Sequence, residues 1–311
     1  MFFPMKNRIK KILIRKKYLT FLLILILFCG CAEAYDNIMV IQSFDVKPYE
    51  DVLEGFEETC KCKVKKIVIS DSDESTILRK IDTSKPDALL AIGIDALSSI
   101  RVINDIPIIY LMVLNPHSIL SGEKNITGIS MNIPPKKQLE IFKKAMPGIK
   151  RIGLLFDPNN SGFFVKRAQD EARKMDVELI TKKVDSSKRV PSLLIDMREN
   201  VDAIWMLPDI TVFSPETIEF LFLFSMENKI PVFTFSKRFI EMGALISLSF
   251  DPFDLGKQGG ELAREMLSGN GIRNLSGTGV RKVIISINST IAKKLGITIS
   301  NEILNDAELI N

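Results

Sequence analysis

The feature that most constrains this chain is a repeated alternation of short apolar runs with longer amphipathic stretches, which begins at Asn37. The apolar runs predict β-strands, and the stretches with apolar residues at helical spacing predict helices. Strands that alternate with helices in this way form parallel sheets with helices on both faces. The sequence therefore predicts an α/β protein.

The alternation occurs twice along the chain. In the first half the predicted strands are 37–42, 64–69, 88–92 and 106–113, and the predicted helices are 48–59, 74–81 and 95–102. After 126–130 it restarts with strands at 151–156, 177–183, 203–207, 231–235, 243–250 and 282–287, and helices at 136–145, 163–175, 191–199, 215–228, 252–267 and 290–295. Two successive open sheets predict two Rossmann-like lobes, and the last segments can cross back between them.

The first thirty residues differ from the rest. Seven Lys and Arg residues between Lys6 and Lys17 precede an apolar run over 19–28. This run is much shorter than the roughly 20 residues that span a bilayer, so we predict a signal peptide over 1–30. Its end is similar to a bacterial lipobox, which makes Cys31 the predicted lipidation site and first mature residue; ordinary cleavage after Ala34 is the alternative. Two acyl chains would hold the exported protein stably on the membrane.

Charge excludes one class of function. The chain has 42 Lys and Arg and 38 Asp and Glu, but the leader holds seven of the basic residues and no acidic one. Without it, 35 basic residues face 38 acidic ones, so no basic nucleic-acid surface is expected.

The cysteines and the single histidine give no metal or redox motif. Cys60 and Cys62 are the thiols left after the leader, and His117 is distant in sequence. An exported protein can form a local disulfide between them, although so short a loop adds little stability. We predict no metal and no cofactor.

Candidate binding residues follow the predicted strands, because open parallel sheets bind ligands outside the carboxyl ends of their strands. Many of them are Asp, Asn, Ser or Thr, which also serve as ordinary helix N-caps and turn residues. The predicted ligand-binding residues are Phe44, Asp45, Gly93, Ile94, Asp95, Asn115, Ser130, Asp157, Asn159, Asp209, Thr211, Ser236 and Asp251.

Catalytic alternatives find little support. The chain has no Gly-x-Ser-x-Gly elbow, no Gly-x-Gly-x-x-Gly fingerprint and no P-loop. Carboxylates such as Asp45, Asp157, Asp209 and Asp251 leave acid–base work open if they share a cleft. No spacing requires it, and we predict that the protein is not an enzyme.

A series of motifs in order resembles a known family. Residues 125–130, the Lys137-Gln138-Leu139-Glu140 segment, residues 146–158, 201–204, 229–233, 243–245, 254–260 and 292–299 are similar to ABC-type substrate-binding proteins of the tryptophan/tyrosine-binding class. The similarity runs from about residue 37 to residue 300.

The resemblance implies a type I periplasmic-binding fold, in which the chain crosses three times between two lobes. Crossings are expected near 128–132, 247–251 and 269–279, which gives a first lobe of 36–128 with 251–270 and a second of 129–250 with 280–300. Family members usually bind amino acids or similar small solutes and deliver them to an ABC permease, and we predict that this chain is a monomer. A sensory lipoprotein that signals to a membrane kinase is the alternative.

Two positions depart from the family pattern. Members commonly carry Gly-Thr after the third strand and Asp-Asn after the Val-Asp-Ala-Ile strand, where this chain has Gly93-Ile94 and Asp209-Ile210. Asp209 is retained and can still pair with a ligand ammonium group, whereas the isoleucines favour a ligand that is more apolar or is not an amino acid.

Overall fold

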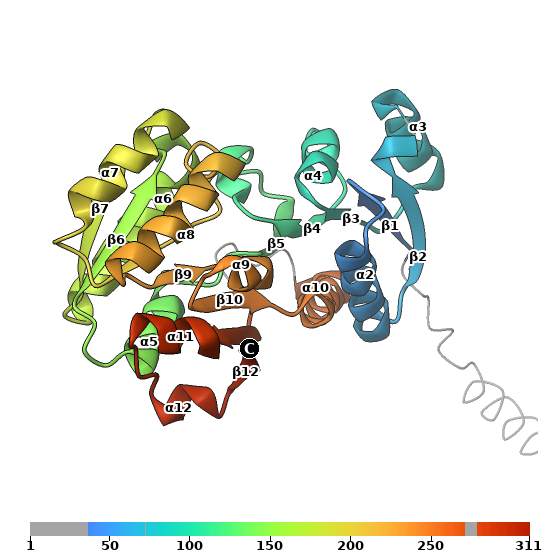
Figure 1. Cartoon of the computed structure of the whole chain (residues 1–311). Coiled ribbons are helices and arrows are strands. Elements are labelled where there is room, and N and C mark those ends of the chain that lie inside the picture. Colours follow the sequence, from blue (N-terminus) through green and yellow to red (C-terminus); the bar gives the residue numbers. More distant parts are fainter. Residues whose placement is uncertain (1–36, 72, 271–278) are drawn as a thin grey trace, which may run out of the picture. The chain divides into compact units, whose positions relative to one another are not determined.

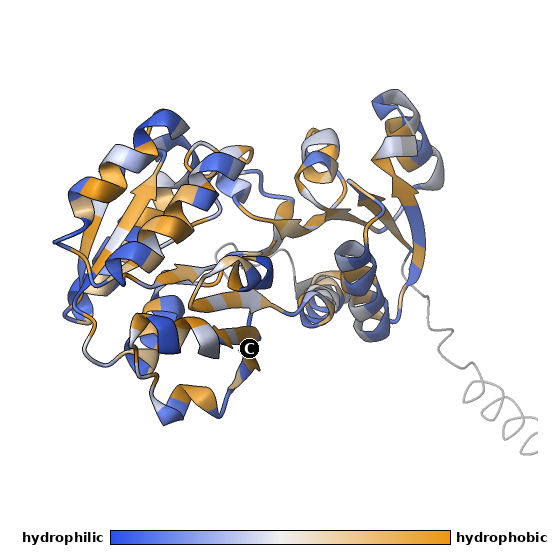
Figure 2. Ribbon diagram, viewed as in Figure 1, coloured by the Kyte–Doolittle hydropathy of each residue, from blue (hydrophilic) through white to orange (hydrophobic). Residues whose placement is uncertain are grey.

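The computed structural model describes residues 37–71, 73–270 and 279–311. The predicted signal peptide and Cys31 lie outside the described residues, as does most of the predicted third crossing. The described residues form two sheets with helices packed on them (Figure 1). Figure 2 shows the strands of both sheets as largely hydrophobic and the helices as hydrophobic on one side, which is the pattern that predicted the α/β class.

The first lobe is a five-stranded parallel sheet with the order β2-β1-β3-β4-β5. Its strands β3 and β4 are buried along their whole length, which explains why they read as continuous apolar runs. The strands are β1 (Asn37–Gln42), β2 (Lys63–Val68), β3 (Ala88–Ile92), β4 (Ile108–Val113) and β5 (Ile126–Ser130), and the helices are α2 (Lys47–Cys60), α3 (Glu74–Ser84), α4 (Ile94–Ile100) and α10 (Pro252–Glu265).

The second lobe is a seven-stranded sheet with the order β12-β11-β10-β9-β8-β6-β7. Its pairs are parallel except β10 with β11, which is antiparallel. The strands are β6 (Arg151–Phe156), β7 (Glu178–Lys183), β8 (Ala203–Trp205), β9 (Val232–Thr234), β10 (Ile246–Phe250), β11 (Val283–Asn288) and β12 (Ala307–Ile310), and the helices are α5 (Pro135–Ala145), α6 (Pro158–Lys174), α7 (Val190–Met197), α8 (Pro215–Asn228), α9 (Lys237–Met242), α11 (Ser289–Leu295) and α12 (Asn301–Leu304). The two-lobed α/β prediction is confirmed.

Several local features differ from the sequence prediction. Strand β5 extends to Ser130 in the first sheet, two residues past the expected boundary at 128, because Ser130 pairs with Val113. Helix α6 begins at Pro158 rather than 163, since the side chain of Asp157 caps it by accepting a hydrogen bond from the Asn159 N–H. Helices α9 and α12 and strand β12 were not predicted because each is short.

Helix α10 packs unusually closely on α2 in the first lobe. A Cβ atom on Gly256 would lie 2.0 Å from the Val52 carbonyl oxygen, and one on Gly55 would lie 2.1 Å from that of Phe253. These distances are far inside van der Waals contact, so only glycine permits this approach of the two backbones. The helix that enters the first lobe from the second is therefore fixed there by packing.

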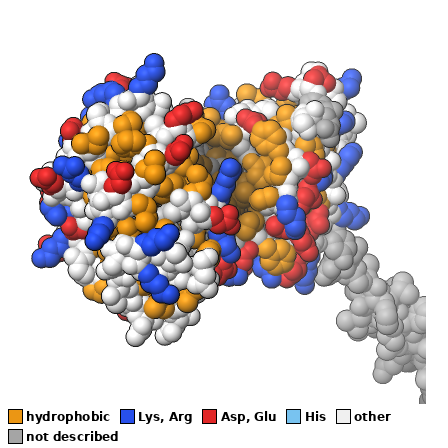
Figure 3. All heavy atoms as spheres, viewed as in Figure 1, with side chains coloured by type: hydrophobic (Ala, Val, Ile, Leu, Met, Phe, Trp, Pro, Cys, Tyr) orange, Lys and Arg blue, Asp and Glu red, His pale blue; other side chains and the backbone are white. Residues whose placement is uncertain are grey.

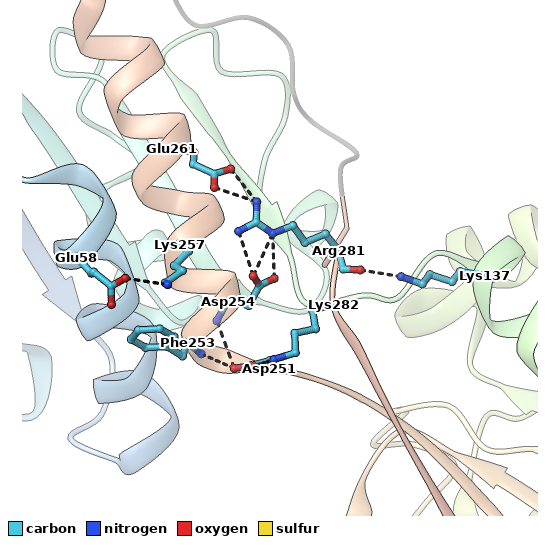
Figure 4. A network of polar contacts seen from close by, with 9 residues as sticks. All are labelled: Glu58, Lys137, Asp251, Phe253, Asp254, Lys257, Glu261, Arg281 and Lys282. Carbon is cyan, nitrogen blue, oxygen red and sulfur yellow. Dashed lines mark hydrogen bonds and ion pairs between the residues drawn. The ribbon is translucent and has the colours of Figure 1, made fainter. Parts of the chain in front are cut away.

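The chain passes between the lobes at 131–134, which join β5 to α5, and at Asp251, which joins β10 to α10. It returns from α10 to β11 through residues that include Arg281 and Lys282. Figure 4 shows Arg281 bonded to Asp254 and Glu261 of α10, with 3.1 Å from its Nε to both Asp254 oxygens. Lys282 bonds to Asp251, and Lys137 of α5 donates to the Arg281 carbonyl oxygen at 2.7 Å.

The two cysteines form a local disulfide at the end of α2. Lys61 between them has a left-handed backbone conformation with φ 56°. Among the described residues there is no group of three or more His, Cys, Asp or Glu side chains placed to hold a metal ion. In residues 37–71, 73–270 and 279–311, no helix combines the length and the apolarity that crossing a membrane requires.

Candidate functional site

A cleft of about 250 Å³ lies between residues of the two lobes. Its size suits a small solute. Figure 3 shows hydrophobic side chains gathered around the hollow where the two lobes meet. Its lining comes from the loops after β4 and β5, from α5 and α6, and from the ends of β8, β9 and β10: Tyr110, Leu114, Asn115, Pro116, His117, Ser130, Met131, Asn132, Ile133, Pro134, Pro135, Gln138, Asn160, Ser161, Phe163, Phe164, Arg167, Met206, Leu207, Pro208, Phe235, Leu248, Phe250 and Gly279.

One face of helix α6 forms a wall of this cleft. Asn160, Phe163, Phe164 and Arg167 all line it, and their spacing of three and four residues places them on one side of the helix. Phe163 is 56 % exposed, and Phe164 packs against the buried Trp205 with ring centroids 5.6 Å apart. The wall therefore combines aromatic surface with one amide and one guanidinium.

Asp209 holds the first turn of α6 in place from behind. Its Oδ2 accepts from the Asp157 N–H at 2.9 Å and the Ser161 hydroxyl at 2.8 Å. Its Oδ1 accepts from the Asn160 amide at 3.2 Å and the Thr211 N–H at 3.1 Å. Four donors fill the acceptor capacity of a carboxylate that is only 2 % exposed.

Asp157 and Thr211 extend the same network. The Thr211 hydroxyl donates to Asp157 Oδ2 at 2.8 Å and accepts from the Asn160 amide at 3.0 Å. Asp157 Oδ1 accepts from the Asn159 N–H at 2.9 Å. Both amide hydrogens of Asn160 are thus committed inside the lobe, which fixes its rotamer.

Two contacts join the lobes at the cleft. The Asn115 amide, after β4, donates to the Asn160 carbonyl oxygen at 3.0 Å. The rings of His117 and Phe163 lie 4.9 Å apart. Nearby, the Ser130 hydroxyl donates to the Leu114 carbonyl oxygen at 3.1 Å, so β5 and the loop after β4 are tied together.

At the floor of the cleft, the buried side-chain amide of Gln138 is surrounded by apolar residues. Gln138 of α5 donates to the Ile133 carbonyl oxygen at 2.8 Å and accepts from the Trp205 indole N–H at 3.2 Å. Its hydrogen bonds order the segment that enters α5 and leave its amide little to offer a ligand.

The strand ends of the first lobe form a separate group. The Ser43 hydroxyl accepts from the Ala96 N–H at 2.9 Å, so the loops after β1 and β3 are adjacent. Gly93 has φ +98°, and a Cβ there would lie 2.8 Å from the Tyr49 hydroxyl. Burial raises the pKa of Tyr49, and the charge of Asp95 raises it further. This group does not line the cleft.

Exposed apolar residues sit beside these strand ends. Phe44 is 52 % exposed and Ile94 38 %, and in the second lobe Ile210, after β8, is 88 % exposed. Asp45 is also exposed, with its Oδ1 3.7 Å from Lys66 Nζ.

Of the predicted ligand-binding residues, Asn115 and Ser130 line the cleft. Asp157, Asp209 and Thr211 lie directly behind its α6 wall, and the exposed Asn159 donates its backbone N–H to the capping Asp157 side chain. Ser236 precedes α9 next to the lining residue Phe235. Asp251 caps α10 and pairs with Lys282.

Sequence reasoning missed the cleft residues of α6. Because the helix was expected to begin at residue 163, Asn160 and Ser161 were read as loop and Arg167 was not singled out. The signal was present: Asp157-Pro158 is a cap followed by a first-turn proline, and Asn160, Phe163, Phe164 and Arg167 share one helical face.

Two α/β lobes with three connecting passages around a small apolar cleft define a solute-binding protein of the periplasmic-binding type I class. The model of the ABC transporter substrate binding protein family matches residues 52–310. The chain belongs to this family, which confirms the resemblance seen in the motifs.

Known relatives agree with this membership. A tyrosine-binding protein of Clostridioides difficile is 29% identical over 229 residues, which cover 71% of this chain and 66% of the relative, just under two thirds of its length. An ABC domain from Streptococcus pneumonia in complex with L-Trp is 24% identical with a TM-score of 0.61, over 89% of this chain and 100% of that chain. The ligand-free, open structure of a substrate binding protein with adhesive properties from Clostridium difficile is 21% identical with a TM-score of 0.71, over 89% and 99%. The two structures show that the fold is shared.

Proposed function

We propose that this protein is an exported lipoprotein that captures a small organic solute, an amino acid or a similar molecule, in the cleft and delivers it to an ABC permease. Membership of the substrate-binding family supports the role, and the relatives named for tyrosine or bound to L-Trp support the size and type of solute. The leader and Cys31 support export and anchoring.

The observation that carries this proposal is the α6 wall of the cleft. Its amide, Asn160, is held by a hydrogen-bonded network around Asp209, while its aromatic side chains and Arg167 remain open to the cleft. Such a wall is rigid before a ligand arrives, and the three passages between lobes let the other side close over it.

Thermal-shift screening of the full chain in mild detergent tests solute binding. The screen should hold amino acids, their derivatives, nucleosides, sugars and short acids, and a cognate solute should raise the melting temperature at micromolar concentration. Isothermal titration then gives the affinity. If no solute of any class binds at millimolar concentration, the capture of a solute is refuted.

Transport and anchoring need tests of their own. Deleting the gene should abolish uptake of the identified radiolabelled solute; intact uptake together with a lost transcriptional response would point to the sensory alternative. Cys31→Ser should release the protein from the membrane fraction, with Cys29→Ser as the matched control. Membrane attachment that survives Cys31→Ser contradicts the lipid anchor.

A further inference from the structure

The charges that line the cleft are of one sign. Arg167 of α6 lines it, and the described lining residues include no Asp or Glu. Arg167 forms no hydrogen bond or ion pair with any residue of the described chain, and its guanidinium carbon lies 5.9 Å from the centre of the Phe163 ring. An unpaired guanidinium over an aromatic ring is a ready partner for a carboxylate.

The two carboxylates behind the α6 wall, Asp209 and Asp157, do not offset this charge toward the cleft. Asp209 is 2 % exposed and accepts hydrogen bonds from four donors of its own lobe. Asp157 accepts from the Asn159 N–H and the Thr211 hydroxyl. To bind Asp209, a ligand ammonium group would have to break this network, and Asp157 does not line the cleft. The expected pairing of Asp209 with an ammonium group therefore finds no open lone pair in this structure.

The other residues that line the cleft favour a solute whose main part is apolar. Phe163, Phe164, Phe235 and Phe250 line the cleft with several aliphatic side chains. Neutral acceptors such as Asn115 Oδ1 remain for a hydroxyl group. An ammonium group placed here would lose hydration beside a like charge, whereas a carboxylate would gain Arg167.

We infer that the preferred solutes of this cleft are apolar or aromatic carboxylic acids that carry no ammonium group, with Arg167 as the group that binds the carboxylate. This inference rests on the proposed solute capture and narrows its substrate class. This specificity differs from that of a receptor for zwitterionic amino acids. The described cleft lining has a guanidinium, from Arg167, to bind a carboxylate but no carboxylate to bind an ammonium group.

Three compounds with one benzene body test the inference directly. Isothermal titration of the full chain in mild detergent compares 3-phenyllactate, L-phenylalanine and phenethylamine, and the indole series of indole-3-lactate, L-tryptophan and tryptamine repeats the comparison. The acid should bind about tenfold or more tightly than the zwitterion, and the amine should not bind. Equal or tighter binding of the zwitterion would overturn the inference and leave solute capture intact.

Variants on α6 connect the preference to Arg167. Arg167→Gln should weaken acid binding about tenfold or more and remove the difference between acid and zwitterion, and Arg167→Lys should keep part of it. Lys166→Gln, on the same helix and outside the cleft lining, should bind as the wild type does. Unchanged acid binding by Arg167→Gln would overturn the assignment. If none of the solutes bind, nor any of the wider screen, it is the proposed function itself that fails.

Discussion

The residues that follow the strands are arranged differently in the two lobes. In the second lobe, Asp157, Asn160, Ser161, Asp209 and Thr211 come from two strand ends and form one hydrogen-bonded network. In the first lobe, the loops after β1 and β3 carry exposed Phe44 and Ile94, and the Ser43 hydroxyl links these two loops. The difference indicates that hydrogen bonds fix the strand ends of the second lobe, while the strand ends of the first lobe leave apolar side chains exposed.

The largest expected effect concerns α10, the helix of the first lobe that follows strand β10 of the second lobe. Gly256→Ala places a Cβ 2.0 Å from the Val52 carbonyl oxygen, so α10 must move off α2 and the free energy of unfolding should fall by about 3 kcal/mol. Gly162→Ala, in helix α6 with only a Pro158 carbon 3.8 Å away, is the matched control and should stabilise by about 0.5–1 kcal/mol. Urea denaturation measures both. Equal effects would mean that the close approach of α2 and α10 is unimportant for the first lobe.

Replacing Asp209, which accepts four hydrogen bonds in the second lobe, tests whether the α6 wall is preorganised. Asp209→Ala leaves the donors of Asn160, Ser161 and Thr211 without their acceptor, so stability should fall by about 2–3 kcal/mol and solute affinity about tenfold. Asp196→Ala removes an exposed carboxylate of the same lobe and should change neither quantity. Unfolding and titration curves of the two variants give the comparison. Weaker binding with unchanged stability would instead favour a direct contact between Asp209 and the solute.

The ion pair between Asp251 and Lys282 predicts that the free energy of unfolding falls at acidic pH. Burial alone would raise the pKa of Asp251, but hydrogen bonds from Lys282 and from the Asp254 and Phe253 N–H groups, with the charge of Lys282, lower it on balance below 3.8. A lowered folded-state pKa stabilises the protein above the unfolded pKa, and this stability is lost as pH falls through the folded value. Asp251→Asn should therefore flatten the loss of stability below about pH 4, measured by thermal unfolding across pH. If the variant loses stability below about pH 4 as steeply as the wild type does, the ion pair does not contribute to stability.

The smallest effect is expected at the disulfide of the first lobe. Cys60 and Cys62 are separated by two positions, so the loop they close is very short and the chain-entropy model gives a stabilisation below about 2 kcal/mol. The double variant Cys60→Ser with Cys62→Ser should unfold slightly earlier and bind solute as the wild type does. A large loss of affinity would tie this end of α2 to the cleft.

Sequence patterns predicted much of the fold because apolar runs and helical spacing are local signals. The strands of the first sheet fell within a few residues of their observed bounds, since β3 and β4 are buried throughout. Strand β5 was read as a connection, because Thr127 and Gly128 interrupt its apolar pattern. Helix α9, with six residues, carries too little periodicity to be recognised.

The candidate site was less predictable, because it depends on which strand ends face one another. Placing residues after strands selected Asn115 and Ser130, which line the cleft, and also Asp45, which lies near Lys66. Nothing local distinguishes these cases. That Asp209 is an internal acceptor depends on donors about fifty residues away at Asp157, Asn160 and Ser161.

The position of α10 in the chain has a consequence for how the protein matures. Its sequence lies after five of the seven strands of the second lobe, yet it packs against α2 in the first lobe. The first lobe consequently cannot bury that side of α2 until residue 265 has been synthesised. During synthesis the segment 37–250 therefore leaves one apolar side of α2 uncovered, which favours a loosely folded chain until α10 has been made.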